Sequence, residues 1–308
     1  MSHWCEHGMP DGELDIAQLE EQIAAALRED VGSGDLTSQG VVPAEATCRG
    51  RFVAREAGVL AGGPVLAPLF RRLDPAVEVE VLVADGALVA AGDVVAVVSG
   101  PARAVLTGER CALNFLQRLS GIATLTRRFV ARAAPYGAQV LDTRKTLPGW
   151  RHLAKYAVRL GGGTNHRMGL YDQVLIKDNH LLLAKRRWPG RAIAGAVEAA
   201  RAASPAGTVI EVEADTLDQV RQALEAGADM ILLDNMTDEE MRQAVALARE
   251  REPRPLLEAS GGVTEERVAA IARTGVDRIS VGALTHSSPA LDIALDFDPP
   301  TLLEEGER

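Results

Sequence analysis

The segment VIEVEADTLDQVRQALEAGADMILLD, from Val209 to Asp234, contains one complete strand–helix–strand unit. Its two ends are apolar runs, and its middle places three apolar residues on one face of a helix: Leu217, Val220 and Leu224. Asp215 is the expected N-cap of this helix, and Gly227 is expected to end it. This order of elements is typical of a parallel sheet with helices packed against it.

Similar apolar runs with polar or glycine ends recur through the second half of the chain, and the last four recur at the spacing of one strand–helix unit. Thr237 begins a capping box before one later helix, and Thr264 is the expected N-cap of the next. Near-continuous apolar strands imply a buried parallel sheet, for which a closed barrel and an open doubly wound sheet both fit. The runs are Val140–Thr143, Val174–Lys177, Val209–Glu213, Met230–Asp234, Leu256–Ser260 and Arg278–Gly282.

The first half differs, because apolar and acidic residues alternate from Val77 onward, as in a half-buried strand. A long helical stretch covers about residues 103–132, and a shorter amphipathic helix is predicted from the spacing of Leu19, Ile23 and Leu27. We expect this half to form a separate layer of helices and strands, with the domain boundary inside the long helix.

The basic residues gather in one segment. Asp142 to Arg187 contains ten Lys and Arg and three Asp, a net charge of +7, whereas the whole chain carries −10. Such a concentration in an acidic protein favours an anionic ligand. A solvated basic face is the alternative, but these cations lie beside glycines and strand-like runs and do not repeat along a helix.

Composition limits the class of protein. A chain of 308 residues with 47% hydrophobic residues can hold one large globular domain or two smaller ones. No apolar run is long enough to span a membrane, the N-terminus lacks a signal-peptide pattern, and the acidic balance argues against nucleic acid as a partner. Three widely separated cysteines indicate reduced thiols, so we expect a cytoplasmic protein. His3, Cys5 and His7 could bind a metal ion, but a frayed tail is favoured because no further ligand is near.

In parallel α/β folds the ligand binds at the carboxyl ends of the strands. Cations there suit phosphates and carboxylates, and two carboxylates suit Mg²⁺ with its bound water or the hydroxyls of a sugar. Glycines after the last two strands let backbone N–H groups approach a phosphate. The residues expected at this mouth are Arg144, Lys145, Lys177, Glu213, Asp234, Ser260 and Gly282.

Several of these residues have plainer interpretations. Gly161–Gly163 can simply end the helix before it, and Glu213 or Asp234 alone can cap the helix that follows. His166 can be a hydrogen-bonded core histidine. Lys177 lies in apolar surroundings, which also suits a Schiff-base nucleophile.

Ordered motifs from about Asp15 to Phe297 closely resemble the quinolinate phosphoribosyltransferases, the carboxylating nicotinate-nucleotide pyrophosphorylases of NAD biosynthesis. No motif position expected to be functional departs from the family pattern. The motifs are EDVGSGDLTS from Glu29, GVLAG from Gly58, ERCALNFLQRLSGIAT from Glu109, TRKTLPG from Thr143, GGGTNHRMGLYD from Gly161, IKDNH from Ile176, EVEAD from Glu211, LLDNM from Leu232, EASGG from Glu258 and ISVGALTHS from Ile279.

The resemblance implies an α/β protein with an N-terminal open α/β sandwich and a C-terminal seven-stranded α/β barrel of the type II phosphoribosyltransferase kind. The expected domains are residues 1–125 and 126–286, with residues 287–308 packing back on the first. It also implies a homodimer with shared active sites, in which the N-terminal part of one subunit closes the barrel mouth of the other.

The resemblance further implies two groups of site residues and Mg²⁺ carried with phosphoribosyl diphosphate, with no metal site of the protein's own. The expected catalytic residues are Lys145, Lys177, Glu213 and Asp234. The quinolinate-binding group is Arg110, Arg144, His166, Arg167 and Lys177. The phosphoribosyl diphosphate group is Lys145, Glu213, Asp234, Ser260, Gly261, Gly262, Val281, Gly282 and Ala283, and Thr143 is a further substrate-binding residue.

Three other functions compete with this one. A related phosphoribosyltransferase-like protein of molybdenum-transport operons shares the fold, but the intact TRKT, NHR and IKDNH motifs favour quinolinate. A Schiff-base lyase or aldolase would use Lys177 as its nucleophile. A ligand sensor without catalysis is disfavoured, because both carboxylates and all the cations are present.

Overall fold

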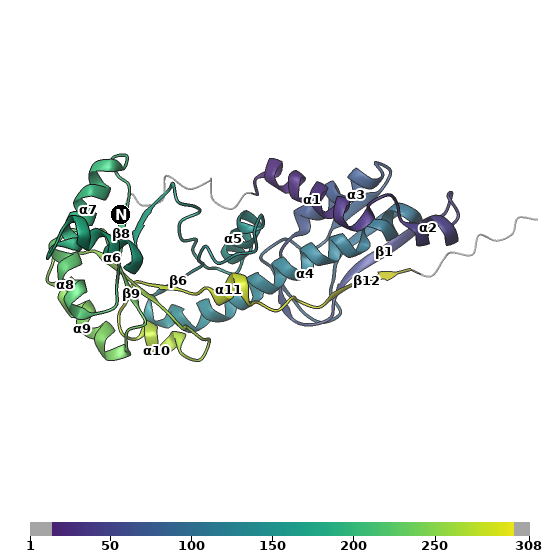
Figure 1. Cartoon of the computed structure of the whole chain (residues 1–308). Coiled ribbons are helices and arrows are strands. Elements are labelled where there is room, and N and C mark those ends of the chain that lie inside the picture. Colours follow the sequence, from purple (N-terminus) through teal and green to yellow (C-terminus); the bar gives the residue numbers. More distant parts are fainter. Residues whose placement is uncertain (1–13, 299–308) are drawn as a thin grey trace, which may run out of the picture. The chain divides into compact units, whose positions relative to one another are not determined.

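The computed structural model describes residues 14–298, so the expectation for His3, Cys5 and His7 lies outside the described residues. The chain divides into two compact units (Figure 1). The parallel-sheet unit consists of Thr126–Leu147 and Gly162–Ser287. The antiparallel-sheet unit consists of residues 14–125, Pro148–Gly161 and residues 288–298. Within residues 14–298, no helix combines the length and apolar character that crossing a membrane requires.

The parallel-sheet unit contains six parallel strands in the order β6-β11-β10-β9-β8-β7. A seventh strand was expected. Its place beside β6 is taken by Thr164, which pairs with Leu141 through one parallel bridge. Gly162, at φ +86°, turns the chain just before this bridge. The strands are β6 (Gln139–Leu141), β7 (Val174–Ile176), β8 (Ile210–Ala214), β9 (Met230–Asp234), β10 (Leu256–Ser260) and β11 (Arg278–Ser280).

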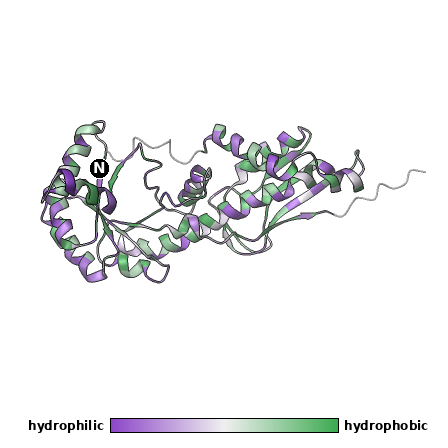
Figure 2. Ribbon diagram, viewed as in Figure 1, coloured by the Kyte–Doolittle hydropathy of each residue, from purple (hydrophilic) through white to green (hydrophobic). Residues whose placement is uncertain are grey.

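Helices follow most of these strands, as the repeated apolar runs predicted. The apolar strands and the apolar faces of the helices are coloured green in Figure 2, and residues such as Ile231, Leu257 and Ile279 are fully buried. The helices are α6 (Asp178–Arg187), α7 (Ala192–Ala203), α8 (Leu217–Glu225), α9 (Asp238–Arg249), α10 (Val268–Ala272) and α11 (Ala283–His286).

The predicted helix starts are right in one case and wrong in two. Thr237 caps α9, and Glu240 completes the capping box. The cap of α8 is Thr216, whose hydroxyl accepts from the Gln219 N–H, and not Asp215. Thr264 does not cap α10, because residues 265–267 form a turn and the helix begins only at Val268.

The antiparallel-sheet unit is built on a four-stranded sheet in the order β12-β1-β5-β3, with a separate two-stranded pair, β2 and β4. The long predicted helix is confirmed as α4 (Ala102–Ala133), and the alternating stretch after Val77 forms β3 (Glu78–Val81). The other elements are α1 (Ile16–Val31), α2 (Leu36–Val41), β1 (Thr47–Ala54), β2 (Gly58–Val59), α3 (Gly63–Leu73), β4 (Leu88–Val89), β5 (Val94–Pro101), the 3₁₀ turn η1 (Ala134–Tyr136), α5 (Arg151–Leu160) and β12 (Ile293–Phe297).

Helix α5 belongs to the antiparallel-sheet unit, although it lies within the expected second domain of residues 126–286. The Tyr156 hydroxyl donates a 2.7 Å hydrogen bond to Asp85, which also accepts the N–H groups of Gly62 and Gly63 at the start of α3. The Trp150 ring, just before α5, stacks on Phe115 of α4 with centroids 4.8 Å apart. These long-range contacts hold α5 against residues far away in the sequence.

Candidate functional site

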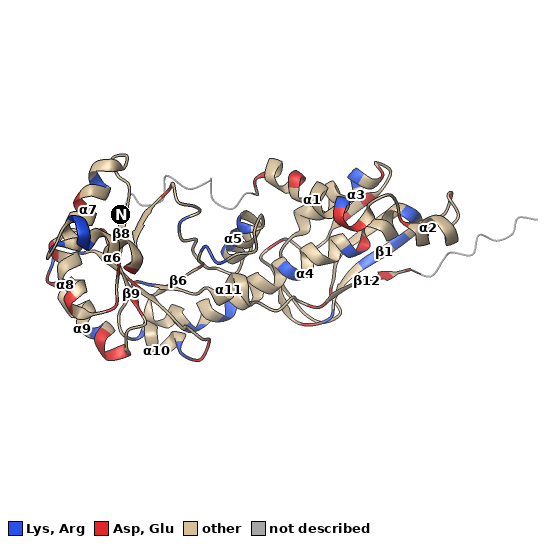
Figure 3. Ribbon diagram, in the orientation of Figure 1, with Lys and Arg blue, Asp and Glu red and all other residues tan. Residues whose placement is uncertain are grey.

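The cations of the basic segment are spread over several elements. Lys185, Arg186 and Arg187 lie in the last turn of α6, where they face the negative end of the helix dipole (blue beside α6 in Figure 3). Arg151, Lys155 and Arg159 belong to α5 in the other unit. Only Arg144, Lys145, Arg167 and Lys177 remain in segments next to the parallel strands, so the basic segment as a whole is not one binding surface.

The remaining predicted residues lie at one edge of the parallel sheet, because the carboxyl ends of parallel strands share that edge. Asp234 ends β9 and is paired in register with Ser260, which ends β10. Lys177 directly follows β7, and Glu213 is the second-last residue of β8. The segments after β6 and β11 add Thr143, Arg144, Lys145, Val281, Gly282 and Ala283.

Two carboxylates and a lysine interact at this edge. Burial raises the pKa of Glu213, the negative charge of Asp234 raises it further, and the positive charge of Lys177 opposes both effects. The three groups are therefore close enough to influence one another. A pair of carboxylates of this kind suits sugar hydroxyls or the waters of a bound Mg²⁺.

Lys177 is held by the histidine of its own motif. The Nδ1 atom of His180 accepts a 2.9 Å hydrogen bond from the Lys177 N–H, which satisfies one of the free donors at the start of α6. This contact fixes the backbone of Lys177 while its side chain stays exposed.

The glycines after β10 make a tight loop. Gly261 has φ +96°, and a Cβ atom there would lie 2.1 Å from Asn235 Oδ1 and 2.9 Å from the Asn235 nitrogen. A Cβ atom on Gly262, at φ +55°, would meet nothing within 4 Å. Gly261 is thus required by packing, whereas Gly262 leaves open space in which backbone donors can approach an anion.

Arg144 and Arg167 form a cationic pair. The Nε atom of Arg144 is buried and has no hydrogen-bond acceptor among the described residues. Burial lowers the pKa of Arg167, and the nearby charge of Arg144 lowers it further. A buried donor without an acceptor, next to a second guanidinium, indicates a place for an anionic group.

His166 lies against two buried carboxylates that the sequence did not single out as site residues. Its Nε2 atom is 3.2 Å from Glu211 Oε2 and 3.5 Å from Glu258 Oε1, and both glutamates are fully buried. Burial lowers the pKa of His166, whereas the contacts with Glu211 and Glu258 and the negative charges of these two acids raise it. A signal for these residues existed, because each is an acid at an interior position of an apolar strand.

The backbone on either side of His166 is also fixed. Asp142, directly after β6, accepts a 2.9 Å hydrogen bond from the His166 N–H and a 2.6 Å bond from the Asn165 side chain. Asp172 accepts the N–H groups of Met168 and Gly169, which closes the loop after Arg167. The structure therefore holds the NHR motif from both ends.

Arg110 belongs to the antiparallel-sheet unit, where it lies exposed on α4. It lines a hollow of about 380 Å³ together with Asp35 and Thr107. The Ser38 hydroxyl, the Ser38 N–H and the Thr107 hydroxyl all donate to Asp35, and these hydrogen bonds lower the pKa of Asp35.

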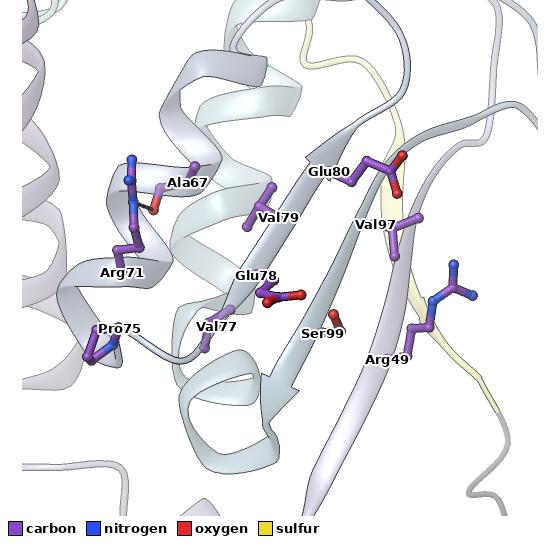
Figure 4. Close-up of a pocket in the computed structure, with 10 residues that line it drawn as sticks. All are labelled: Arg49, Ala67, Arg71, Pro75, Val77, Glu78, Val79, Glu80, Val97 and Ser99. Atoms are coloured by element: carbon purple, nitrogen blue, oxygen red, sulfur yellow. Dashed lines mark hydrogen bonds between the residues drawn. The ribbon is translucent and has the colours of Figure 1, made fainter.

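Another hollow, of about 570 Å³, lies in the same unit between α3 and strands β3, β5 and β1 (Figure 4). Its charged residues are of both signs, and Arg71 donates to the Ala67 carbonyl of its own helix turn. Neither hollow includes a residue of the strand-end group. The strand ends, where four cations and two carboxylates gather, are therefore the candidate site.

This fold and site define a class of protein: an α/β protein with a parallel-strand unit whose strand ends suit a strongly anionic ligand. Sequence profiles identify the class further. Residues 122–296 match the quinolinate phosphoribosyl transferase C-terminal domain, and residues 35–120 match the N-terminal domain of the same family. The chain belongs to the quinolinate phosphoribosyltransferase family.

Individual relatives agree with the family assignment. A probable nicotinate-nucleotide pyrophosphorylase [carboxylating] from Synechocystis is 45% identical, over 88% of this chain and 90% of the relative. A nicotinate-nucleotide pyrophosphorylase [carboxylating] from Mycobacterium leprae is 43% identical, over 94% of this chain and all of the relative. The solved structure of the nicotinate-nucleotide pyrophosphorylase from Francisella tularensis superposes with a TM-score of 0.85 at 37% identity, over 93% of this chain and 98% of that one.

Proposed function

We propose that this chain transfers the phosphoribosyl group of phosphoribosyl diphosphate to quinolinate and releases CO₂, giving nicotinate mononucleotide and diphosphate in NAD biosynthesis. The observation that carries the proposal is the match to both domains of one enzyme family, over residues 35–120 and 122–296. The cationic and acidic groups at the strand ends agree with two anionic substrates.

Quinolinate is a dianion, and the guanidinium groups of Arg144 and Arg167 suit its two carboxylates. Lys177 supplies a further positive charge, and His166 precedes Arg167 in the same loop. The nicotinate ring without its 2-carboxylate would leave part of this charge unpaired. We therefore propose quinolinate as the accepted substrate of this group.

Phosphoribosyl diphosphate is the second anion. Lys145 and the backbone donors of Gly261, Gly262 and Gly282 suit its phosphates. Glu213 and Asp234 suit the ribose hydroxyls or the waters of the Mg²⁺ that accompanies the diphosphate. Ser260, Val281, Ala283 and Thr143 complete the proposed binding group.

The chemistry needs no nucleophile from the protein. As diphosphate leaves, positive charge develops at the ribose C1, which a nearby carboxylate stabilises, and negative charge develops on the leaving group, which Lys145 stabilises. The pyridine nitrogen of quinolinate forms the bond to C1. The resulting pyridinium accepts the electron pair of the breaking C–C bond as the 2-carboxylate leaves as CO₂, and a proton then takes the vacated ring position.

We further propose a homodimer in which Arg110 of one subunit completes the quinolinate site of the other. The exposure of Arg110 on α4, and its place in a different unit from Arg144 and Arg167, support this arrangement. We also propose a cytoplasmic location, which the free thiols of Cys48 and Cys111 support.

One assay tests the proposed function. The protein is incubated with quinolinate, phosphoribosyl diphosphate and Mg²⁺, and CO₂ and nicotinate mononucleotide are measured. Formation of both products in equal amounts is expected, and the absence of both would refute the proposal. Borohydride treatment during turnover separates the Schiff-base alternative, because only that mechanism would leave a trapped adduct on Lys177.

A further inference from the structure

Four residues of the parallel-sheet unit form a closed circuit of contacts around Arg167. The Arg167 N–H donates to His166 Nδ1 at 2.7 Å, and His166 Nε2 lies 3.2 Å from Glu211 Oε2. On the other side, Arg167 Nη1 donates to the Gln173 carbonyl at 3.2 Å, and the Gln173 side chain donates to Glu211 Oε2 at 2.8 Å. Both arms of the circuit therefore end on one oxygen of Glu211.

The contacts determine where His166 carries its proton. Two N–H groups cannot face each other at 2.7 Å, so Nδ1 is unprotonated where it accepts from Arg167. The ring proton is then on Nε2, which faces Glu211 and Glu258. The negative charges of Glu211 and Glu258 favour a positively charged His166 ring with a proton on each nitrogen. The 2.7 Å contact with the Arg167 N–H leaves no room for a proton on Nδ1, so the ring is neutral. Burial and the negative charge of Glu258 both raise the pKa of Glu211.

The two glutamates are costly to keep in this place. Both are fully buried, and neither oxygen of Glu258 has a hydrogen-bond partner among the described residues, the nearest contact being His166 Nε2 at 3.5 Å. Buried ionic groups of this kind are weak evidence for a contribution to stability. Arg278 on β11 offsets part of the charge of Glu211.

The same three side chains could in principle hold a metal ion, because their donor atoms lie within 4.8 Å of one another. A histidine that binds a metal through one ring nitrogen donates the N–H of the other to an acceptor. His166 Nδ1 faces a donor instead, the Arg167 N–H. This arrangement favours a hydrogen-bonded circuit over a metal site.

We propose that Glu211 is a positioning residue for Arg167. Through His166 it positions the Arg167 backbone, and through Gln173 it positions the Arg167 guanidinium. Glu258 keeps the His166 ring in its orientation. The inference rests on the proposed function, in which Arg167 binds a carboxylate of quinolinate. It assigns His166 to the support of Arg167 and assigns a role to two acids outside the expected site residues.

Three variants test the proposal through their kinetics. Glu211→Met removes the acceptor and keeps an unbranched side chain of similar length, so the KM for quinolinate should rise by about 10- to 100-fold, as expected for a displaced binding group. The KM for phosphoribosyl diphosphate should change by less than about twofold, since its binding group lies elsewhere. Glu211→Gln keeps one acceptor oxygen and should restore most of the quinolinate affinity. Glu225→Gln, an exposed acid on α8, is the matched control and should behave as wild type.

A spectroscopic measurement tests the circuit without relying on activity. Nitrogen-15 NMR of labelled histidine, with His166→Gln for assignment, should show Nε2 protonated and Nδ1 unprotonated in the wild-type protein without ligands, and loss of this fixed form in Glu211→Met. If wild type fails to turn over quinolinate, the proposed function is wrong, while this measurement still decides the circuit.

Three outcomes would overturn the inference. The first is an unchanged KM for quinolinate in a folded Glu211→Met protein. The second is a His166 ring protonated on both nitrogens at neutral pH. The third is a shift of the His166 signals on adding Zn²⁺ alone, which would make the cluster a metal site.

Discussion

The Thr285 hydroxyl donates a 2.7 Å hydrogen bond to the backbone carbonyl of Lys145 and so joins the segment after β11 to the segment after β6. These two strands are neighbours in the parallel sheet, and Thr285 is buried. Gly282 makes room for the same lysine, because a Cβ atom there would lie 3.1 Å from Lys145 Cδ. The position of Lys145 is thus set by the segment that follows the neighbouring strand β11.

Thr285→Val should therefore weaken the binding of phosphoribosyl diphosphate. The substitution leaves the Lys145 carbonyl without its donor, a loss of about 0.5–1.5 kcal/mol in a typical case. We expect the KM for phosphoribosyl diphosphate to rise severalfold, with little change in the KM for quinolinate. Thr285→Ser keeps the hydroxyl and serves as the control. Equal KM values in the Val and Ser variants would show that the bond does not position Lys145.

The two glycines after β10 should respond differently to alanine. Gly261→Ala places a Cβ atom against Asn235, in a backbone conformation that costs about 1–2 kcal/mol for any side chain. We expect a lower melting temperature and at least about a tenfold loss of kcat/KM. Gly262→Ala carries the conformational cost without the clash, so it should lose clearly less stability. Thermal melts of both variants check this order, and a more stable Gly261→Ala would contradict it.

Substrate choice should follow the number of cations at the strand ends. Nicotinate lacks the 2-carboxylate of quinolinate and would leave buried positive charge unpaired, at a cost of roughly 2–5 kcal/mol. Turnover of nicotinate should therefore be negligible beside that of quinolinate under the same conditions. Comparable kcat/KM values for the two acids would disprove a site built for a dicarboxylate.

The shared-site dimer can be tested with two inactive variants. Arg110→Ala and Lys177→Ala homodimers should each fold and lose about 100-fold or more in activity. A mixed dimer would combine both defects in one site and leave the other site intact. Purified mixed dimers should therefore approach half of wild-type activity. Mixed dimers as inactive as their parents would show that Arg110 does not act across the interface.

Cys111 should be chemically inert in the folded protein. Burial, together with the charges of Asp30 and Glu29, raises the pKa of its thiol to about 11. At neutral pH almost none of it is thiolate, and reactivity should increase only as the pH rises toward that value. Iodoacetamide labelling followed by mass spectrometry should modify Cys48 before Cys111, because Cys48 is only partly buried. Rapid labelling of Cys111 at pH 7 in the folded protein would contradict this expectation.

The parts of the structure that depend on local pattern were predictable from the sequence. The apolar runs predicted the strands, and the spacing of apolar residues predicted α1. The helical stretch after Pro101 predicted α4, and the rule that ligands bind at strand ends selected Glu213 and Asp234. The sequence could not decide which of two adjacent residues caps a helix. Asp215 and Thr216 can both cap a helix, and the point where the chain leaves β8 decides in favour of Thr216.

Contacts between distant residues could not be predicted in this way. Glu211 and Glu213 are two residues apart in β8, so the sequence predicts that both face the same side of the strand. Only the folded structure shows that Glu211 lies against His166. The partner of Tyr156 is Asp85, 71 residues away, so nothing local assigns α5 to the antiparallel-sheet unit. Both cases depend on tertiary packing, which the pattern of one segment does not contain.

The position of α5 also determines which fragments of this protein can fold on their own. The chain passes between its two units after residues 125, 147, 161 and 287, so neither unit is a continuous piece of the gene. A fragment that stops at residue 125 would lack α5 and also β12, the strand that pairs with β1 at the edge of its sheet. A fragment that begins at residue 126 would carry α5 without the Asp85 carboxylate that binds Tyr156. Truncations at the apparent boundary should therefore give insoluble pieces, whereas co-expression of the two fragments can restore a folded complex.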